Sequence, residues 1–282
     1  MNIPRLIRSL LILSISAPAL TATAAETPFR AGCEAYTFNQ FTVYEAIEKT
    51  SEAGGTVIEF YSGQPLTATD PAKVGPGLSD EQVNALLAHL EKNHVVATSW
   101  FADIPKEEAQ ARKFFEFAHR MKFQCITTES VASIDTIEKL VKEFDIRVGF
   151  HEHAKRPNDP SYKLWDPQFV HDLVKDRDHR IGACADTGHW ATSGLVPLDA
   201  LKILDGRAIS LHLKDRTRIG GQTTDQILGT GVSNIAGILQ ELRRTKFDGC
   251  IYIEYEANWG KNVSDVRKCL DFIRNPVVKP KS

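Results

Sequence analysis

The sequence predicts a single (β/α)8 barrel, and three observations support that prediction. Short β-prone segments alternate with helical patterns eight times along the chain, as expected for a sheet of parallel strands. The 282 residues, less a predicted leader of 25, leave 257, which is close to the usual size of one such barrel. Five of the β-prone segments end on a residue that can bind a metal or move a proton: 125–129, 148–151, 182–186, 208–212 and 250–254. A barrel collects its active-site residues at these C-terminal strand ends.

The first four strand–helix pairs are bounded by capping and turn residues. Gly54 and Gly55 follow the first helical pattern, as is common where a helix ends. Ser79 stands where the N-cap of the second helix is expected. We predict strands over 29–36, 56–60, 95–99 and 124–129, followed by helices over 42–53, 80–92, 106–121 and 133–144.

The last four pairs continue the alternation, with two longer loops. Residues 152–163 form a loop that contains Pro157 and Pro160, and a glycine-bearing loop follows the seventh strand as far as Gly231. No linker or change of composition interrupts the series, so we expect one domain over 26–275 and a flexible tail over 276–282. The predicted strands are 146–151, 181–186, 208–213 and 250–255, and the helices are 166–175, 197–204, 233–244 and 263–274. A glycine-rich first turn, usual in open doubly wound sheets, is absent from the sequence.

Residues 1–25 have the layout of a secretory signal peptide. Arg5 and Arg8 precede an apolar run over 10–20, which is followed by small residues over 21–25. The run is shorter than the roughly 20 residues that span a bilayer, which argues against a membrane anchor. We therefore expect the protein to be exported and periplasmic. Removal of the two arginines takes the formal net charge from −2 to −4, which suits neither a nucleic-acid backbone nor an anionic membrane as partner.

The cysteines have no spacing typical of a zinc site, and their odd number excludes complete pairing. Most stand in predicted strands where a small apolar residue would serve equally well. We expect buried thiols rather than disulfides. The five are Cys33, Cys125, Cys184, Cys250 and Cys269.

Side-chain parity gives the strand-end residues a common direction. Successive side chains of a strand alternate between its faces, and small or polar residues mostly stand two positions before each terminal group. The terminal groups should therefore point into one space: Glu129, His151, Asp186, His212 and Glu254. Imidazoles combined with carboxylates favour Zn, Mn, Co or Fe over Mg, so we expect one divalent ion of that group.

Each of these groups also has an ordinary structural explanation. A single strand-end carboxylate is often a helix N-cap or half of a surface ion pair. His153 either contacts substrate or stabilises the following loop. Asp215 fits better as a partner of Lys214 or Arg216 than as a metal ligand, and Glu152 should face away from the barrel interior.

Five short motifs, in this order, resemble the xylose-isomerase-like TIM barrel superfamily, often labelled sugar phosphate isomerases/epimerases. The resemblance covers nearly the whole chain after the leader, and it is more specific for the superfamily than for a reaction. The motifs are His151-Glu-His153, Asp186-Thr-Gly-His189, His212-Leu-Lys-Asp215, Gly229-Thr-Gly231 and Ile253-Glu-Tyr-Glu256. Superfamily members include ketose 3-epimerases, hydroxypyruvate isomerase, inosose dehydratase, xylose isomerase and abasic-site endonucleases.

The resemblance implies that Asp186, His212 and Glu254 bind the metal. The fifth-strand ligand is commonly Glu in the family, whereas this chain has His151 there. That departure weakens the analogy with epimerases that use two glutamates as acid and base. Glu129 could supply the missing carboxylate, either on the metal or as the base. His189 matches the residue that meets substrate oxygens in relatives.

The expected activity is that of a metal-dependent isomerase or epimerase that acts on a keto-sugar through an enediolate. Candidate catalytic residues are Glu129, Glu254, His153 and Lys214. Besides His189, three tryptophans near the predicted mouth could contact substrate: Trp100, Trp190 and Trp259. Export favours an unphosphorylated carbohydrate, and the glycine pairs of the seventh loop fit hinges better than a phosphate cradle.

Two alternatives from other classes remain at this stage. One is a lyase, a dehydratase or an enzyme that cleaves keto-glycosides, using the same metal site. The other is a non-catalytic periplasmic module that binds a sugar or a metal. A nuclease is opposed by export and by the acidic charge. The sequence leaves the oligomeric state open, and a homo-oligomer is possible.

Overall fold

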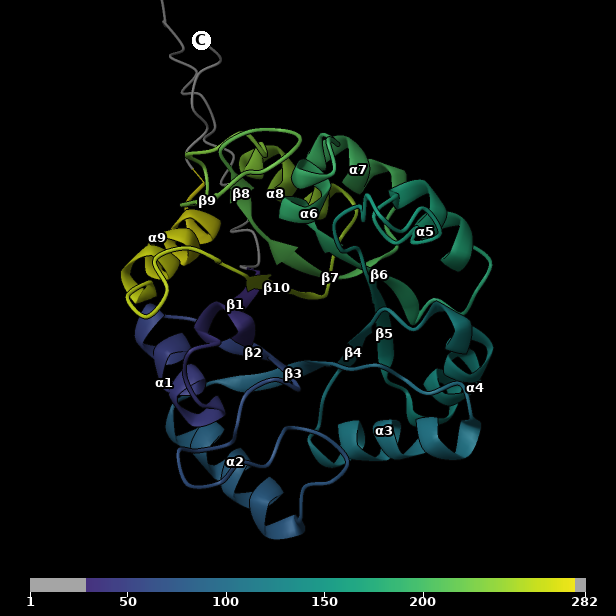
Figure 1. Ribbon diagram of the computed structural model, residues 1–282, viewed down its shortest axis with the longest axis vertical. Coiled ribbons are helices and arrows are strands. Elements are labelled where there is room, and N and C mark those ends of the chain that lie inside the picture. Colours follow the sequence, from purple (N-terminus) through teal and green to yellow (C-terminus); the bar gives the residue numbers. More distant parts are fainter. Residues whose placement is uncertain (1–28, 277–282) are drawn as a thin grey trace, which may run out of the picture.

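The computed structural model describes residues 29–276, and these form a closed parallel barrel. Eight strands follow one another around the ring, with helices on the outside (Figure 1). In chain order the barrel strands are β1 Arg30–Glu34, β2 Val57–Tyr61, β3 Val96–Phe101, β4 Cys125–Thr128, β5 Arg147–His151, β6 Ile181–Asp186, β7 Ala208–Leu213 and β10 Cys250–Ile253. The barrel closes where β1 pairs with β10, which confirms the predicted fold class.

The outer helices follow the strands as predicted. The predicted helix end at Gly54 and the predicted N-cap at Ser79 are both confirmed. Gly54 ends α1 in the left-handed conformation with a φ of 90°, and Ser79 caps α2 in a reciprocal capping box with Gln82. The helices are α1 Val43–Ala53, α2 Asp80–Lys92, α3 Glu108–Arg120, α4 Ile134–Phe144, α5 Pro167–Val174, α7 Pro197–Ile203, α8 Ile235–Arg244 and α9 Val263–Arg274.

Several short elements were not predicted, and they lie at the C-terminal ends of the strands. A short helix, α6 (Thr187–Thr192), begins directly after β6, and a two-stranded hairpin is formed by β8 (Asp215–Arg216) and β9 (Asp225–Gln226). Short 3-10 helices, η1 (Ala35–Phe38) and η2 (Val131–Ser133), follow β1 and β4. The predicted first strand was therefore too long at its C-terminal end. The strand ends at Glu34, whose carboxylate accepts a hydrogen bond from the backbone amide of Tyr36.

The strand register brings the predicted site residues to one end of the barrel. Asp186 on β6 pairs with His212 on β7, and His212 pairs with Tyr252 on β10. His151 is the last residue of β5, and Glu254 comes directly after β10. All five cysteines are buried and free, as expected. In the described residues, no helix is long and apolar enough to cross a membrane. The predicted signal peptide, 1–25, and nearly all of the predicted tail lie outside the described residues.

Candidate metal centre and active site

Four buried side chains converge at the C-terminal end of the barrel. One donor atom from each of His151, Asp186, His212 and Glu254 lies within 4.8 Å of the others. His151 Nε2 is 3.7 Å from Asp186 Oδ2, which is 3.8 Å from His212 Nδ1, and that nitrogen is 3.0 Å from Glu254 Oε2. The structure thus brings together four of the five strand-end residues that were predicted to point into one space, among them the three ligands that the family resemblance implies.

Three of these atoms are buried without a hydrogen-bond partner among the described residues. They are His151 Nε2, Asp186 Oδ2 and His212 Nδ1. A buried polar atom left unpaired costs about 1–3 kcal/mol, so three at one point call for a common partner. Two imidazole nitrogens and two carboxylates suit a borderline divalent cation. The donor set therefore fits such an ion.

A glutamate stands behind each of the two imidazoles. Glu59 Oε1 on β2 lies 2.6 Å from His212 Nε2, and Glu129 Oε1 lies 3.1 Å from His151 Nδ1. When Nε2–H of His212 donates to Glu59, its Nδ1 lone pair faces the cluster. In His151 the two nitrogens exchange roles: when Nδ1–H donates to Glu129, Nε2 faces the cluster. This arrangement is typical of metal-binding histidines, in which a carboxylate fixes the tautomer and the ring orientation.

Glu59 was not predicted as part of the site. It is fully buried, and its second oxygen accepts the hydroxyl of Thr127 at 2.6 Å. The predicted second strand ended at Phe60, and the alternation of its side chains gave Glu59 no role in the predicted site. A shift of register between β2 and β3 lies at this point, where Glu59 pairs with Ser99 and Thr98 of β3 is skipped. A single carboxylate within the apolar run 57–60 was the signal available in the sequence.

Lys214 supplies positive charge beside the cluster. Its side chain is fully buried, with Nζ 3.0 Å from Glu254 Oε2 and 3.4 Å from Asp186 Oδ2. It also bonds to Glu256 Oε1. Burial opposes the charge of Lys214, but the surrounding carboxylates outweigh it and raise its pKa well above the ordinary value. Gly188 leaves room for this lysine, because a Cβ at Gly188 would lie 2.6 Å from the Lys214 Cβ and Cδ atoms.

The two carboxylates of the cluster remain ionised. Burial raises the pKa of Asp186, but His189, Lys214 and His151 outweigh it, so the pKa falls well below its ordinary value. The pKa of Glu254 is likewise lowered, because Lys214 and His212 outweigh burial. Ionised carboxylates are the form that coordinates a cation.

A pocket of about 330 Å³ opens directly above the cluster. The residues that line it are Glu34, Tyr36, Tyr61, Phe101, Glu129, His151, His153, His189, His212, Glu254 and Glu256. His153 and His189 face each other with ring centroids 4.2 Å apart, and His189 Nε2 is 3.7 Å from Asp186 Oδ2. Burial lowers the pKa of both His153 and His189, which makes them neutral imidazoles at neutral pH.

Glu129 lies beside the cluster and is held by three neighbours. Besides His151, it accepts hydrogen bonds from Arg156 at 2.9 Å and from the Tyr162 hydroxyl at 3.0 Å, both through Oε2. Its oxygens are not among the four converging donor atoms. Glu129 thus stands in the pocket wall, where a base would be, and its bond to His151 positions that ring.

Two of the three predicted substrate-binding tryptophans lie in the core. Trp100 is 2% exposed and stacks against Phe114 with ring centroids 5.4 Å apart. Trp190 is fully buried, and its indole nitrogen donates to Glu152. Their predicted position at the mouth is therefore wrong, because both indoles complete the packing of helices on strands. Trp259 does lie near the mouth, where its ring packs edge-to-face with that of Tyr36, with the centroids 6.0 Å apart.

Asp215 organises the loop after the seventh strand. Its carboxylate accepts hydrogen bonds from the backbone amides of Gly229, Gly231 and Ser233 at 2.8–3.0 Å. The expected partners, the side chains of Lys214 and Arg216, bind other carboxylates instead. A Cβ at Gly231 would lie 2.4 Å from the Asp215 Oδ1 atom, so only glycine fits there. The amides that a phosphate would use are thus occupied by Asp215. The glycines are therefore part of the turn that Asp215 holds.

The sequence analysis also missed most of the pocket wall. Glu34, Tyr61, Phe101 and Glu256 line it, although only His153, His189 and the strand-end residues were predicted. Burial and the nearby Glu254 raise the pKa of Glu34 well above its ordinary value. Its signal in the sequence was a carboxylate at the end of the first β-prone run.

The geometry agrees with comparisons to known proteins. A search of curated protein sequences gave no match. Among solved structures, the chain is similar to an uncharacterised protein from Parabacteroides distasonis ATCC 8503, with 28% identity and a TM-score of 0.69. That alignment covers 87% of this chain and 98% of the other.

Two further structures share the fold at lower identity. D-psicose 3-epimerase from Clostridium cellulolyticum H10, solved with D-tagatose, is 16% identical with a TM-score of 0.66, over 87% of this chain and 98% of that one. A protein of Bacillus anthracis assigned as a 3-DHS dehydratase is 17% identical with a TM-score of 0.63, over 88% and 100%. Residues 124–275, more than half of the chain, match the model of one family. The protein therefore belongs to the xylose isomerase-like TIM barrel family.

Proposed function

We propose that the protein is a divalent-metal-dependent enzyme that moves protons next to the carbonyl group of a keto-sugar or a related carbohydrate. The observation that carries this proposal is the convergence of four donor atoms at the base of an open pocket, three of them buried without a hydrogen-bond partner among the described residues. His151, Asp186, His212 and Glu254 would hold the ion. The two imidazoles favour Mn, Co, Zn or Fe over Mg.

A divalent ion held there would stabilise negative charge on a substrate carbonyl oxygen when the neighbouring C–H bond loses its proton. Three groups of the chain can then handle that proton. Glu254 is ionised, and His153 is a neutral imidazole in the pocket wall, so either can accept it. Glu34 faces the same pocket, and its raised pKa favours the protonated form, which can donate one. Return of a proton to another carbon or to the other face gives isomerisation or epimerisation.

The pocket wall supports an unphosphorylated substrate. Four glutamates line the pocket, and its lining contains no Arg or Lys. A phosphate group would find no guanidinium or ammonium group in this lining to bind it. The aromatic rings of Tyr36, Tyr61 and Phe101 provide apolar surface on which a sugar ring can stack. Export, as predicted from residues 1–25, points to the same substrate class.

A lyase is the second candidate, and the fold shared with a dehydratase favours keeping it. Its first step is the same proton abstraction. The difference is the fate of the carbanion, which expels a β-substituent instead of taking up a proton. Product analysis in the exchange experiment separates the two, because a lyase yields an unsaturated or cleaved product.

The test is deuterium uptake from D₂O by a panel of ketoses, 3-keto-glycosides and their phosphorylated counterparts, with Mn, Co or Zn. We expect exchange with an unphosphorylated member. Glu254→Gln should lower the rate at least about 10²-fold, because it removes a base and weakens a ligand. Glu116→Gln, an exposed change on α3, is the matched control and should have no effect. Exchange with phosphorylated sugars alone would contradict the substrate class. No exchange with any carbonyl sugar would favour a binding module.

A further inference from the structure

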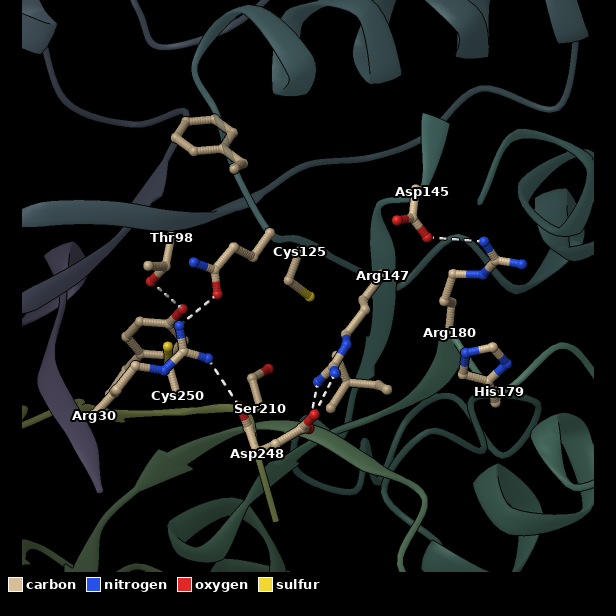
Figure 2. A pocket seen from close by; sticks show the side chains of 15 residues that line it. Arg30, Thr98, Cys125, Asp145, Arg147, His179, Arg180, Ser210, Asp248 and Cys250 are labelled. Carbon is tan, nitrogen blue, oxygen red and sulfur yellow. Dashed lines mark hydrogen bonds and ion pairs between the residues drawn. The ribbon is translucent and has the colours of Figure 1, made fainter. Parts of the chain in front are cut away.

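A second cavity lies at the opposite end of the barrel. It has a volume of about 430 Å³ and is bordered by the first residues of four strands, Arg30, Cys125, Arg147 and Cys250 (Figure 2). The Tyr252 hydroxyl, bonded to Thr98 at 2.7 Å, lies on its inner wall. Glu254 of the metal centre follows two residues further along the chain. No described residue lines both this cavity, called the lower cavity below, and the pocket at the metal centre, called the upper pocket. The two are therefore distinct.

The charged lining of the lower cavity differs from that of the upper pocket, because it contains arginines. Three arginines, Arg30, Arg147 and Arg180, line it together with two carboxylates. Arg147 forms a bidentate pair with Asp248, at 2.6 and 2.5 Å. Arg180 pairs with Asp145 at 2.9 Å and, bidentately, with Asp178 at 2.8 and 2.9 Å. The upper pocket, in contrast, is lined by glutamates.

Arg30 is the arginine whose charge is least compensated. Nη1 donates to the side-chain oxygen of Gln124 at 2.6 Å, and Nη2 donates to the backbone oxygen of Asp248 at 2.8 Å. Both acceptors are neutral, whereas the guanidinium groups of Arg147 and Arg180 bond to carboxylates. A guanidinium has five N–H donors, so Arg30 keeps further donors for a ligand.

Ser210 supplies a second, independent observation. It is 1% exposed, lines the cavity, and its hydroxyl oxygen has no hydrogen-bond partner among the described residues. Its contact with the Cys184 thiol is a weak one, because thiols are poor hydrogen-bonding groups. Figure 2 shows the Ser210 side chain between the ends of Arg30 and Arg147.

The strand register explains how Ser210 and Arg30 come to share the cavity. Arg30 pairs with Cys250, and Cys250 pairs with Ser210. Adjacent strands lie about 4.8 Å apart, so the two Cα atoms are about 10 Å apart across the sheet. An arginine side chain and a small ligand together span that distance.

We propose that the lower cavity binds a small oxyanion, a carboxylate or a phosphate, held by the charge of Arg30 and the hydroxyl of Ser210. The guanidinium of Arg30, whose two acceptors are neutral, selects an anion, and the buried hydroxyl gains the hydrogen bond that it lacks. The volume is sufficient for a small organic acid. The two ends of the barrel then sort ligands by charge, with an uncharged carbohydrate above and an anion below.

The test is isothermal titration of the metal-loaded chain with inorganic phosphate and with malonate at low ionic strength. We expect saturable binding of at least one of them, and the better ligand identifies the class of oxyanion. Arg30→Gln should weaken it about tenfold or more, and Ser210→Ala about threefold. Arg30→Lys keeps the charge and should retain most of the affinity. Glu254→Gln, at the other end of the barrel, should leave it unchanged.

Three results would overturn the proposal. They are the absence of saturable binding by either anion, binding that Arg30→Gln leaves intact, and binding that Glu254→Gln abolishes, which would move the anion to the metal centre. A crystal structure of the wild-type protein soaked with the better ligand gives a check that needs no variant. Density for the anion between Arg30 and Ser210 supports the proposal, and ordered water alone contradicts it.

Discussion

His151 and His212 each have one nitrogen bonded to a glutamate and the other directed at the space between the strand ends. The sequence predicted the two imidazoles and the two carboxylates of the cluster, because strand parity is a local property of the chain. It did not predict Glu59, whose partner is 153 residues away. Contacts across the barrel depend on shear and bulges, which no local pattern encodes.

Glu59 should influence the metal without touching it. Glu59→Gln weakens the bond that fixes the tautomer of His212, so we expect the affinity for Zn or Mn to fall about 10–100-fold. The fold should persist, because the amide has the same size. Competition with a chromophoric chelator measures the affinity, and Glu116→Gln is the control. An unchanged affinity would show that Glu59 has no part in orienting His212.

Glu129 and His151 should differ in a measurable way. His151→Ala removes a donor atom and should abolish stable metal binding. Glu129→Gln should lower the affinity while leaving deuterium exchange intact at saturating metal, because Glu129 contacts His151, Arg156 and Tyr162. A Glu129→Gln variant that binds metal normally but no longer exchanges deuterium would instead identify Glu129 as the base.

At the scale of elements, the strands and outer helices were predictable, and the small elements at the top of the barrel were not. The helices have apolar faces and capping residues that are visible in the sequence, such as Ser79 and Gly54. The short helix α6 and the β8–β9 hairpin consist of few residues, and tertiary contacts stabilise them. Asp215 is such a case, since its amide partners lie 14–18 residues further along the chain.

The loop held by Asp215 should be sensitive to substitution. Asp215 is buried and accepts several backbone amides, so Asp215→Ala leaves those donors unpaired. We expect a loss of about 2–4 kcal/mol in the free energy of unfolding, measured in urea. Asp103→Ala, at an exposed position, should change stability by less than about 0.5 kcal/mol. Equal effects of the two changes would contradict the role given to Asp215.

The β8–β9 hairpin should give a pH dependence of known sign. Burial raises the pKa of Asp225 to about 6, against the lowering effect of Lys214 and Arg216. The folded state therefore binds this proton more tightly than the unfolded chain does. The resulting stability is present below about pH 4, and it is lost as the pH rises through about 6.

Asp225→Asn should remove that dependence. Between pH 4 and 7 the wild type should lose up to about 3 kcal/mol relative to the variant, from a shift of about two pKa units. Asp248→Asn gives a control of opposite sign, because hydrogen bonds from Arg147 lower the pKa of Asp248. Its effect should be small, since that side chain is 72% exposed. Parallel stability curves for wild type and Asp225→Asn would contradict the prediction.

For the whole molecule, the number and order of strand–helix pairs determined the fold class, and the sequence contains both. The position of large aromatic residues was harder to predict. Trp100 and Trp190 stand close to strand ends in the sequence, yet their side chains pack outward under helices and loops. Whether a residue near a strand end faces the mouth or the outer layer depends on how the following loop folds back, which only the assembled barrel determines.

The metal content of the purified protein tests the central claim most directly. After dialysis against Mn or Zn, the wild type should retain about one ion per chain, because one ring of donors surrounds one ion. His212→Ala should retain almost none while keeping its circular dichroism spectrum, and His119→Ala, an exposed change on α3, should retain the full amount. Full occupancy in His212→Ala, or no ion in the wild type, would contradict the assignment of this cluster as a metal centre.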